Sequence, residues 1–183
     1  TSESRFRYAR GGGVDPWTPG QLTLLNETES VRSLSSTHIE VLGTSSGILT
    51  ANDAGVEMSD LSGAVTWSYA NTNIHSLTTD GDNWYIGTTG GEIYSGTNAA
   101  GSGTLYNNFS TTANVLVRWV KGRLIATVGR AVHEGAGGTW TQIDPGTTFP
   151  SGWTWTDIAE GPSAIYLAGN AGDQAAIYKI EAT

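Results

Sequence analysis

Residues 153–180 read WTWTDIAEGPSAIYLAGNAGDQAAIYKI and carry the clearest strand pattern in the chain. Three strand-like runs, 154–159, 164–169 and 175–180, are separated by turn-forming Gly-Pro and Asn-Ala-Gly-Asp segments. No window of the stretch repeats its apolar residues at the 3.6-residue period of a helix. The pattern therefore predicts three antiparallel strands of one sheet.

The same unit recurs upstream. Aligning the second strand and the turn after it gives LGTSSGIL (42–49), IGTTGGEI (86–93), IATVGRAV (125–132) and LAGNAGDQAAI (167–177), which begin 44, 39 and 42 positions apart. In this register the first strands are 31–34, 74–78, 115–120 and 155–159, and the fourth strands are 65–69, 104–109 and 139–143. A period of roughly 40 residues with four short strands per unit is typical of β-propeller blades. The sequence therefore predicts an all-β propeller of about four blades, at about 31–72, 73–113, 114–152 and 153–183.

The last of these units lacks a fourth strand, and the start of the chain offers one. Residues 1–13 are polar and basic and end in three Gly, so we expect an arm or linker there, either a surface tail or an arm docked on a neighbouring subunit. Residues 14–25 contain two prolines and an alternating run, which favours an edge strand. We expect this strand to complete the last blade and close the ring. The alternative is a four-blade segment of a larger propeller.

Composition excludes several classes of function. The chain has 25 Gly, seven Trp and seven Tyr but only 14% charged residues, as strand-and-turn proteins do. A net charge of -8 and a pI near 4.7 disfavour nucleic acid and anionic lipid as partners. Without Cys there are no disulfides or thiolate metal sites. No apolar run approaches the roughly 20 residues of a membrane-spanning helix, so we expect no membrane insertion.

Three units join their third and fourth strands by Gly-containing turns, 63–67, 101–105 and 137–140, that lead to Thr-Trp or a near match. These turns resemble the end of the Asp-box, S-x-D-x-G-x-T-W, of sialidase-like and photosynthesis-factor-like propellers. In the third unit, His133 and Gly135 take the Ser and Asp positions. Such turns are structural, so we expect Trp67 and Trp140, together with Trp17, to pack between blades.

No catalytic constellation emerges, and we predict no catalytic residue, no cofactor and no enzyme activity. A sialidase needs several Arg that converge on a substrate carboxylate, whereas Arg118 and Arg130 are the two that could face one mouth of the ring. The three His lie in different blades without metal-ligand spacing. Asp80 and Asp82 crowd oxygen ligands into one turn, but this candidate calcium site lacks the Gly and distal Glu of a full calcium loop, and a plain polar turn is the other interpretation.

Binding is easier to place than catalysis. In a propeller, the turns between second and third strands and the linkers between blades open on one face. The longest linker, 144–153, carries Phe149 and Trp153, while Arg130, Asn170 and Asp173 belong to neighbouring turns of that face. Exposed aromatic rings beside amide and carboxylate groups suit a sugar or a protein partner. The other interpretation is an ordinary linker with a buried Trp.

The last unit also carries a family resemblance. The segments Asp157-Ile158-Ala159-Glu160-Gly161-Pro162, Ala164-Ile165-Tyr166 and Ile177-Tyr178-Lys179-Ile180 resemble blades in minor tail proteins of tailed phages, particularly those that infect actinobacteria. The resemblance is strong over less than a sixth of the chain and consists mostly of turn and core residues. It implies a virion component at the tail or tail tip, where propellers act as spacers or as modules that bind the host surface. No catalytic residue is carried over.

The resemblance leads to one expected function and two alternatives. We expect a virion structural protein that assembles with other tail proteins or copies of itself, attaches through many weak contacts to the host surface (glycan or envelope), or does both. One alternative is an extracellular propeller glycosidase or lectin that acts on cell-surface glycans. The other is a scaffold that only spaces neighbouring domains.

Overall fold

In a computed structural model of the 183-residue chain, the structure describes residues 14–15, 23–24, 37–144, 146 and 149–181. The chain divides into two compact units, Thr1–Ser33 and Leu34–Thr183. Within the first unit, β1 (Val14–Asp15) pairs antiparallel with β2 (Thr23–Leu24). None of the described residues belongs to a helix that could cross a membrane.

The second unit consists of four antiparallel sheets in which each strand pairs with the next along the chain. The first contains β3 (His38–Thr44), β4 (Gly47–Asn52), β5 (Gly55–Ser59) and β6 (Val65–Ala70). The second contains β7 (Ile74–Thr79), β8 (Asn83–Thr88), β9 (Glu92–Thr97) and β10 (Thr104–Asn108). The third contains β11 (Val115–Val120), β12 (Arg123–Val128), β13 (Ala131–Ala136) and β14 (Thr139–Asp144). The last contains only β15 (Thr154–Glu160), β16 (Ala164–Ala171) and β17 (Gln174–Glu181).

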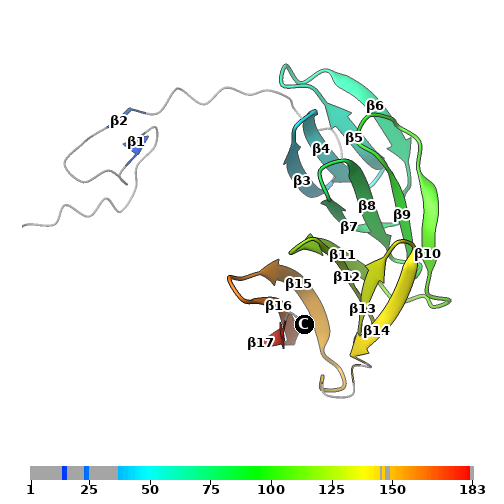
Figure 1. The fold of residues 1–183 in the computed structure, drawn as a ribbon, viewed down its shortest axis with the longest axis vertical. Helices are drawn as coiled ribbons and strands as arrows, with labels where there is room; N and C mark the ends of the chain where they lie inside the picture. Colours follow the sequence, from blue (N-terminus) through cyan, green and yellow to red (C-terminus); the bar gives the residue numbers. More distant parts are fainter. Residues whose placement is uncertain (1–13, 16–22, 25–36, 145, 147–148, 182–183) are drawn as a thin grey trace, which may run out of the picture. The chain divides into compact units, whose positions relative to one another are not determined.

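Within this unit the sheets follow one another in an open arc (Figure 1). The first strands β3, β7, β11 and β15 form its inner edge, where β7 packs against β3 and β11, and β11 packs against β15. The fourth strands β6, β10 and β14 form its outer edge (Figure 1). The first and last sheets lie at the two ends of the arc.

Each pair of consecutive sheets encloses its own apolar cluster. The buried side chains form three groups, centred on Leu49 and Trp84 between the first two sheets, on Ile93 and Val117 between the middle two, and on Ile125 and Ile165 between the last two. Packing is tight around Trp84, because a Cβ on Gly96 would lie 2.5 Å from its ring. Successive sheets therefore pack face to face, and the second strands β4, β8 and β12 are buried along almost their whole length.

The first sheet corrects the predicted register. Leu42, which we expected in a second strand, lies in β3, the first strand of its sheet, and 31–34 lie outside the described residues. The turn-based alignment thus matched the first strand of the first sheet with the second strands β8, β12 and β16 of the other sheets. The second strands β4, β8, β12 and β16 begin at residues 47, 83, 123 and 164, so their starts are 36, 40 and 41 residues apart.

Identical turn chemistry in two different hairpins explains this error. In the β3–β4 turn, the Thr44 hydroxyl accepts a hydrogen bond from the Ser46 amide at 3.2 Å, and Gly47 has φ 143°. In the β8–β9 turn, the Thr88 hydroxyl accepts one from the Gly90 amide at 3.2 Å, and Gly91 has φ 81°. A Thr followed three residues later by Gly suits both hairpins, so the local motif does not reveal which hairpin of a sheet it closes.

The expected closure of the ring is not found. The predicted strand within 14–25 is seen as β1 and β2, which pair with each other, and the last sheet has β17 at its edge with β16 as its neighbour. The arc is open and agrees with the alternative, a segment of a larger propeller.

Candidate functional site

We use the name linker face for the side of the arc that carries the turns between second and third strands and the linkers between sheets. It contains the turn at Arg130, the turn at 172–173 and the linker between β14 and β15. The name hairpin face is used for the opposite side, with the turns between first and second and between third and fourth strands. Each face has a cavity.

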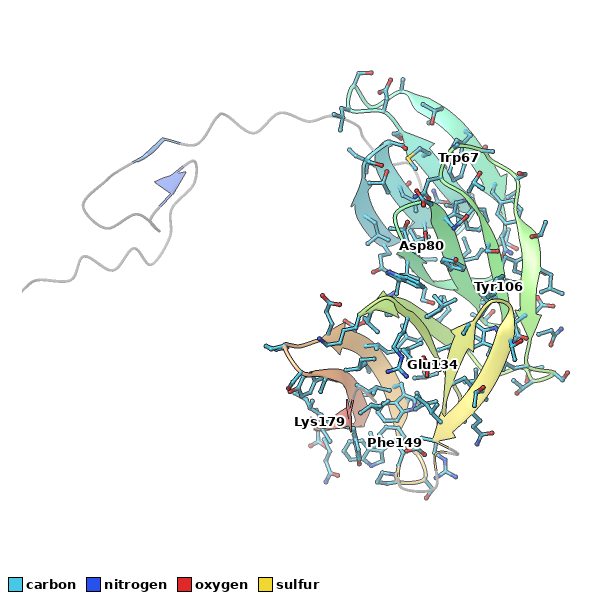
Figure 2. All side chains as sticks on the ribbon, viewed as in Figure 1. Trp67, Asp80, Tyr106, Glu134, Phe149 and Lys179 are labelled. Carbon is cyan, nitrogen blue, oxygen red and sulfur yellow. The ribbon has the colours of Figure 1, made fainter. Side chains whose placement is uncertain are left out.

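The linker between β14 and β15 is anchored by an aromatic cluster. Phe149 is 1% exposed and stacks on Trp155, with 3.7 Å between ring centroids and 5° between planes. Trp153 and Tyr178 meet Phe149 at its edge, at 5.8 and 5.2 Å. Gly169 makes room for the ring, since a Cβ there would lie 2.4 Å from it. Phe149 is therefore not an exposed, ligand-facing aromatic as predicted, because its neighbours enclose it (Figure 2).

Arg130 ties the same linker to the third sheet. Its guanidinium Nη1 donates a hydrogen bond to the Phe149 carbonyl at 2.8 Å, while its own carbonyl accepts one from Trp155 Nε1 at 3.0 Å. Asn170 Oδ1 accepts a hydrogen bond from the exposed Thr154 hydroxyl at 3.1 Å. Asp173 is exposed in the turn between β16 and β17. Four of the five predicted residues thus lie in or beside one linker. Their contacts support the structure of this linker more than they offer contacts to a ligand.

Next to this cluster lies the linker-face cavity, of about 550 Å³. Its polar and aromatic lining comes from the second, third and last sheets and consists of His75, Asn114, Thr127, Thr154, Trp155 and Thr156. Asn114, Thr154 and Thr156 are exposed at the rim, whereas Thr127 is 2% exposed at the base. Burial and the positive charge of Arg118 lower the pKa of His75, so its imidazole is neutral at pH 7.

A charged network at the inner edge joins all four sheets. Arg118 Nη1 donates to Glu40 Oε2 at 2.8 Å and to the Leu77 carbonyl at 2.9 Å, and Arg118 Nε donates to Asp157 Oδ1 at 3.1 Å. Glu40 also accepts the Leu77 amide at 3.2 Å. The charge of Arg118 is thus shared by two carboxylates, which holds the inner strands together and leaves this Arg unsuited to clamp a substrate carboxylate.

Sequence reasoning did not single out Glu40 or Asp157. Arg118 and Glu40 are 78 residues apart, so no local pattern connects them. A signal was present nonetheless, since each of the three is a charged residue inside the first strand of its sheet.

On the hairpin face, a cavity of about 390 Å³ lies between the second and third sheets, lined in part by Asp80, Tyr106 and Glu134 (Figure 2). Asp80 Oδ1 accepts the amides of Asp82 and Asn83 at 2.9 and 2.7 Å, and its Oδ2 accepts the Tyr85 hydroxyl at 2.9 Å. Burial and this hydrogen bond raise the pKa of Tyr85.

The Asp80 oxygens therefore face N–H and O–H donors, the arrangement of a polar turn and not of a calcium loop. Among the described residues, no group of three or more Asp, Glu or His side chains is placed to hold a metal ion.

Glu134, in the same cavity, forms a two-pronged ion pair with Arg123 of the neighbouring strand. The hydrogen bonds from Arg123 lower the pKa of Glu134 and raise that of Arg123. The carboxylates of Asp80 and Glu134 thus both have hydrogen-bond partners within the protein.

The Trp residues of the Gly-containing turns lie between sheets. Trp67 Nε1 donates to the Asn98 carbonyl of the second sheet at 3.0 Å, and its ring lies 6.2 Å from Trp84. Trp140 meets Tyr106 and Phe109 of the second sheet edge-on, at 6.3 and 5.4 Å. Trp17 lies outside the described residues.

The turn before Trp67 is capped by the side chain of Asp60. Asp60 Oδ1 accepts the amides of Ser62 and Ala64 at 2.8 and 3.0 Å and the Ser62 hydroxyl at 2.6 Å, which lowers the pKa of Asp60.

Solved structures resemble this arc. It matches YCF48 bound to D1 peptide with a TM-score of 0.56 and 14% identity, over 84% of this chain and 53% of that one. It matches the WD40 beta propeller domain of Doa1 with a TM-score of 0.55 and 12% identity, over 81% and 53%. The fold is a β-propeller. BamB from Moraxella catarrhalis gives a TM-score of 0.54 and 14% identity, over 75% of this chain and 45% of that one.

The prediction of propeller blades is thereby confirmed, and the four sheets are called blades from here on. The chain spans about half the length of these propellers, at 45 to 53% of theirs. At 12 to 14% identity the likeness concerns the fold alone. No known protein family and no curated protein matches the sequence.

Proposed function

We propose that this propeller is a structural component of a phage tail or tail tip that attaches to glycan on the host surface through its linker-face cavity. The observation that carries the binding function is the lining of that cavity, in which one aromatic ring is surrounded by hydroxyl, amide and imidazole groups. The proposed place in a phage tail is supported by the amino-acid sequence of the last blade, which resembles minor tail proteins at 157–162, 164–166 and 177–180.

The lining suits a neutral, hydroxyl-rich ligand. Trp155 is held by its stack on Phe149 and by its hydrogen bond to the Arg130 carbonyl, so little conformational freedom is lost when a ligand packs against it. Thr154, Thr156 and Asn114 place donors and acceptors at the rim, and the neutral His75 can donate or accept. An apolar surface with a few oriented polar groups is the usual form of a small-ligand site.

Binding without cleavage is the function we propose for this cavity. Glycoside hydrolysis generally uses two carboxyl groups that flank the scissile bond. The described residues that line the cavity include no carboxylate, and the nearby Asp157 bonds to Arg118. In a tail with several copies, weak single-site contacts add through avidity.

The binding half is tested by titrating bacterial cell-wall glycan fragments into the protein and following the indole and imidazole NMR signals. We expect the signals of Trp155 and His75 to shift, and the joint change Asn114→Ala with Thr156→Ala to weaken binding at least tenfold. Both of these side chains are exposed, so the fold is expected to survive. Thr139→Ala, an exposed Thr on the hairpin face, is the matched control and leaves binding unchanged. Shifts confined to other residues, or no binding to any fragment, would contradict the proposal.

The phage setting is tested separately, by mass spectrometry of purified virions from the host of origin. Peptides of this chain are expected among the tail proteins. Their absence, together with glycan binding, would favour the extracellular lectin, and release of reducing sugar from the same fragments would favour the glycosidase. Inactivity in both glycan assays, with the peptides present, would favour a scaffold.

A further inference from the structure

A buried threonine at the base of the linker-face cavity has an unused hydroxyl. Thr127 is 2% exposed and lines the cavity, yet its hydroxyl makes no hydrogen bond with any residue that the structure describes. Its oxygen is not among the described side-chain atoms that are both unpartnered and sealed from solvent, which belong to Trp84, Asn98 and Trp140. It therefore stays open to the cavity. Buried polar groups nearly always have a hydrogen-bond partner, so this exception needs an explanation.

The corresponding threonine of the second blade has its hydroxyl fully used. Thr88 stands at the same place in IGTTGGEI (86–93) as Thr127 does in IATVGRAV (125–132). The Thr88 hydroxyl accepts hydrogen bonds from the amides of Gly90 and Glu92 at 3.2 and 3.1 Å and donates one to the Glu92 carbonyl at 3.2 Å. The usual role of this threonine is thus to cap the turn that follows it.

A tighter turn in the third blade removes that role from Thr127. There β12 and β13 stay paired up to Val128 and Ala131, so Thr127 lies inside the ladder. In the second blade the pairing of β8 with β9 ends before Thr88, which therefore belongs to the turn. The hydroxyl that stabilises a turn in one blade is thus available for another partner in the next.

The rest of the cavity lining indicates what kind of group that partner is. Leu116, which is 5% exposed, and Ala113 add apolar side chains to the cavity. The imidazole of His75 and the amide of Asn114 add polar groups that likewise have no hydrogen bond to the residues described. None of the described residues that line the cavity is charged at pH 7. The lining therefore suits an uncharged group that combines a hydrogen-bonding dipole with a small apolar part.

We propose that the linker-face cavity binds an N-acetylated amino sugar, with its acetamido group at Thr127 and its ring against Trp155. This inference rests on the proposed function and names the class of glycan. An acetamido group joins an amide to a methyl group and projects further from the sugar ring than a hydroxyl does. Its carbonyl accepts from the Thr127 hydroxyl, and its methyl packs on Leu116. The Asn114 amide and the neutral His75 each supply an acceptor for its N–H.

The same contacts discriminate against a sugar without the acetamido group. A ligand that displaces water from a polar group and does not replace its hydrogen bond loses affinity. Thr127 lies below the rim, so a ring hydroxyl held against Trp155 leaves its hydroxyl without a partner. The expected preference for the acetylated sugar is roughly tenfold or more, because a buried polar group left unpaired is costly.

Two neutral trisaccharides of the same linkage test this assignment. The trimer of N-acetylglucosamine and cellotriose differ only in their acetamido groups, and we expect calorimetry to show the preference for the acetylated trimer. In saturation-transfer NMR the acetamido methyl protons should receive the strongest signal from the protein. Equal affinities, or binding of other cell-wall fragments but of neither trimer, would overturn the assignment and leave glycan binding in place. Absence of binding to every fragment would overturn the proposed function as well.

Two substitutions of Thr127 test its part in the preference. Thr127→Val removes the hydroxyl and keeps the shape of the side chain, so the ratio of the two affinities should fall to about one. Thr127→Ser keeps the hydroxyl and should retain the preference. A preference that survives in Thr127→Val would overturn the inference, because another group would then recognise the acetamido group.

Thermal stability distinguishes a ligand-binding hydroxyl from a structural one. Because the Thr127 hydroxyl has no partner among the described residues, Thr127→Val should melt at or above the wild-type temperature. Thr88→Val is the matched contrast and should melt several degrees lower, since it loses the hydrogen bonds that cap its turn. An equally low melting temperature for Thr127→Val would show a structural role for its hydroxyl and contradict the inference.

Discussion

The cavities on the two faces of the propeller differ in how their polar groups are satisfied. On the hairpin face, Asp80 bonds to Tyr85 and Glu134 pairs with Arg123, so the charged groups are paired within the protein. On the linker face, Thr154 and Thr156 are exposed at the rim around Trp155, and the nearby His75 is neutral. This difference is the reason why we propose the ligand site on the linker face and not on the hairpin face.

The largest effect is expected from the wall of the linker-face cavity. Phe149→Ala removes a fully buried ring from its stack on Trp155, so the free energy of unfolding should fall by about 3–5 kcal/mol. The affinity for glycan should also fall, because Trp155 loses the Phe149 ring on which it stacks. Urea denaturation followed by tryptophan fluorescence measures the first effect, and titration measures the second.

Leu105→Ala is the control for this change, since Leu105 is 52% exposed and its truncation should cost less than about 0.5 kcal/mol. A Phe149→Ala variant as stable as the wild type would mean that this cluster does not hold the linker.

A smaller effect is expected on the hairpin face, and on stability alone. Glu134→Gln breaks the ion pair with Arg123. Both side chains are about a quarter exposed, so solvent screening limits the loss in the free energy of unfolding to about 1 kcal/mol at pH 7. Arg123 lowers the pKa of Glu134 in the folded protein. The contribution of this ion pair to stability is therefore fully present above the ordinary pKa of 4.5, and it is lost as the pH falls through the lower pKa of the folded protein. Wild type and variant should therefore converge in urea midpoint below pH 4.5.

Glycan affinity should be the same for the Glu134→Gln variant and the wild type. A drop in affinity with this variant would break the proposed division between the two faces and place the ligand, or its influence, on the hairpin face.

The smallest effect concerns histidine titration. Burial lowers the pKa of both His75 and His133, but only His75 is also affected by the charge of Arg118. Arg118→Gln should therefore raise the pKa of His75 toward its ordinary value and leave His133 unchanged. NMR titration of the imidazole signals measures both residues in one sample, so His133 serves as an internal control. Equal changes at both would indicate a general loosening of the fold.

Sequence patterns located most of the strands because alternation and turn residues act locally. For 115–120 the predicted and observed strands coincide, and most other strands of the last three blades differ by one or two residues at an end. The first blade was misplaced because the Thr-x-x-Gly turn at Thr44 and the one at Thr88 have the same chemistry in different hairpins. A repeat is aligned reliably only by its buried positions, and burial follows from tertiary structure.

The site was predicted only in part, for a related reason. Blade topology was enough to assign Arg130, Phe149 and Asn170 to one face, where the structure places them near Trp155. Whether a ring on that face is exposed depends on its neighbours, and Phe149 is enclosed by side chains from the linker and the last blade. The lining residues His75 and Asn114 come from different blades and carry no common motif.

The series of four-stranded units with an incomplete last one follows from the sequence alone, because strand alternation, glycine turns and a roughly 40-residue repeat are local features of the chain. The sequence did not determine whether the ring closes. That was decided by tertiary structure, since closure depends on the angle at which one sheet packs on the next and on the partner that each edge strand finds. Both are sums over contacts between residues far apart in the chain, and in this protein they leave the arc open.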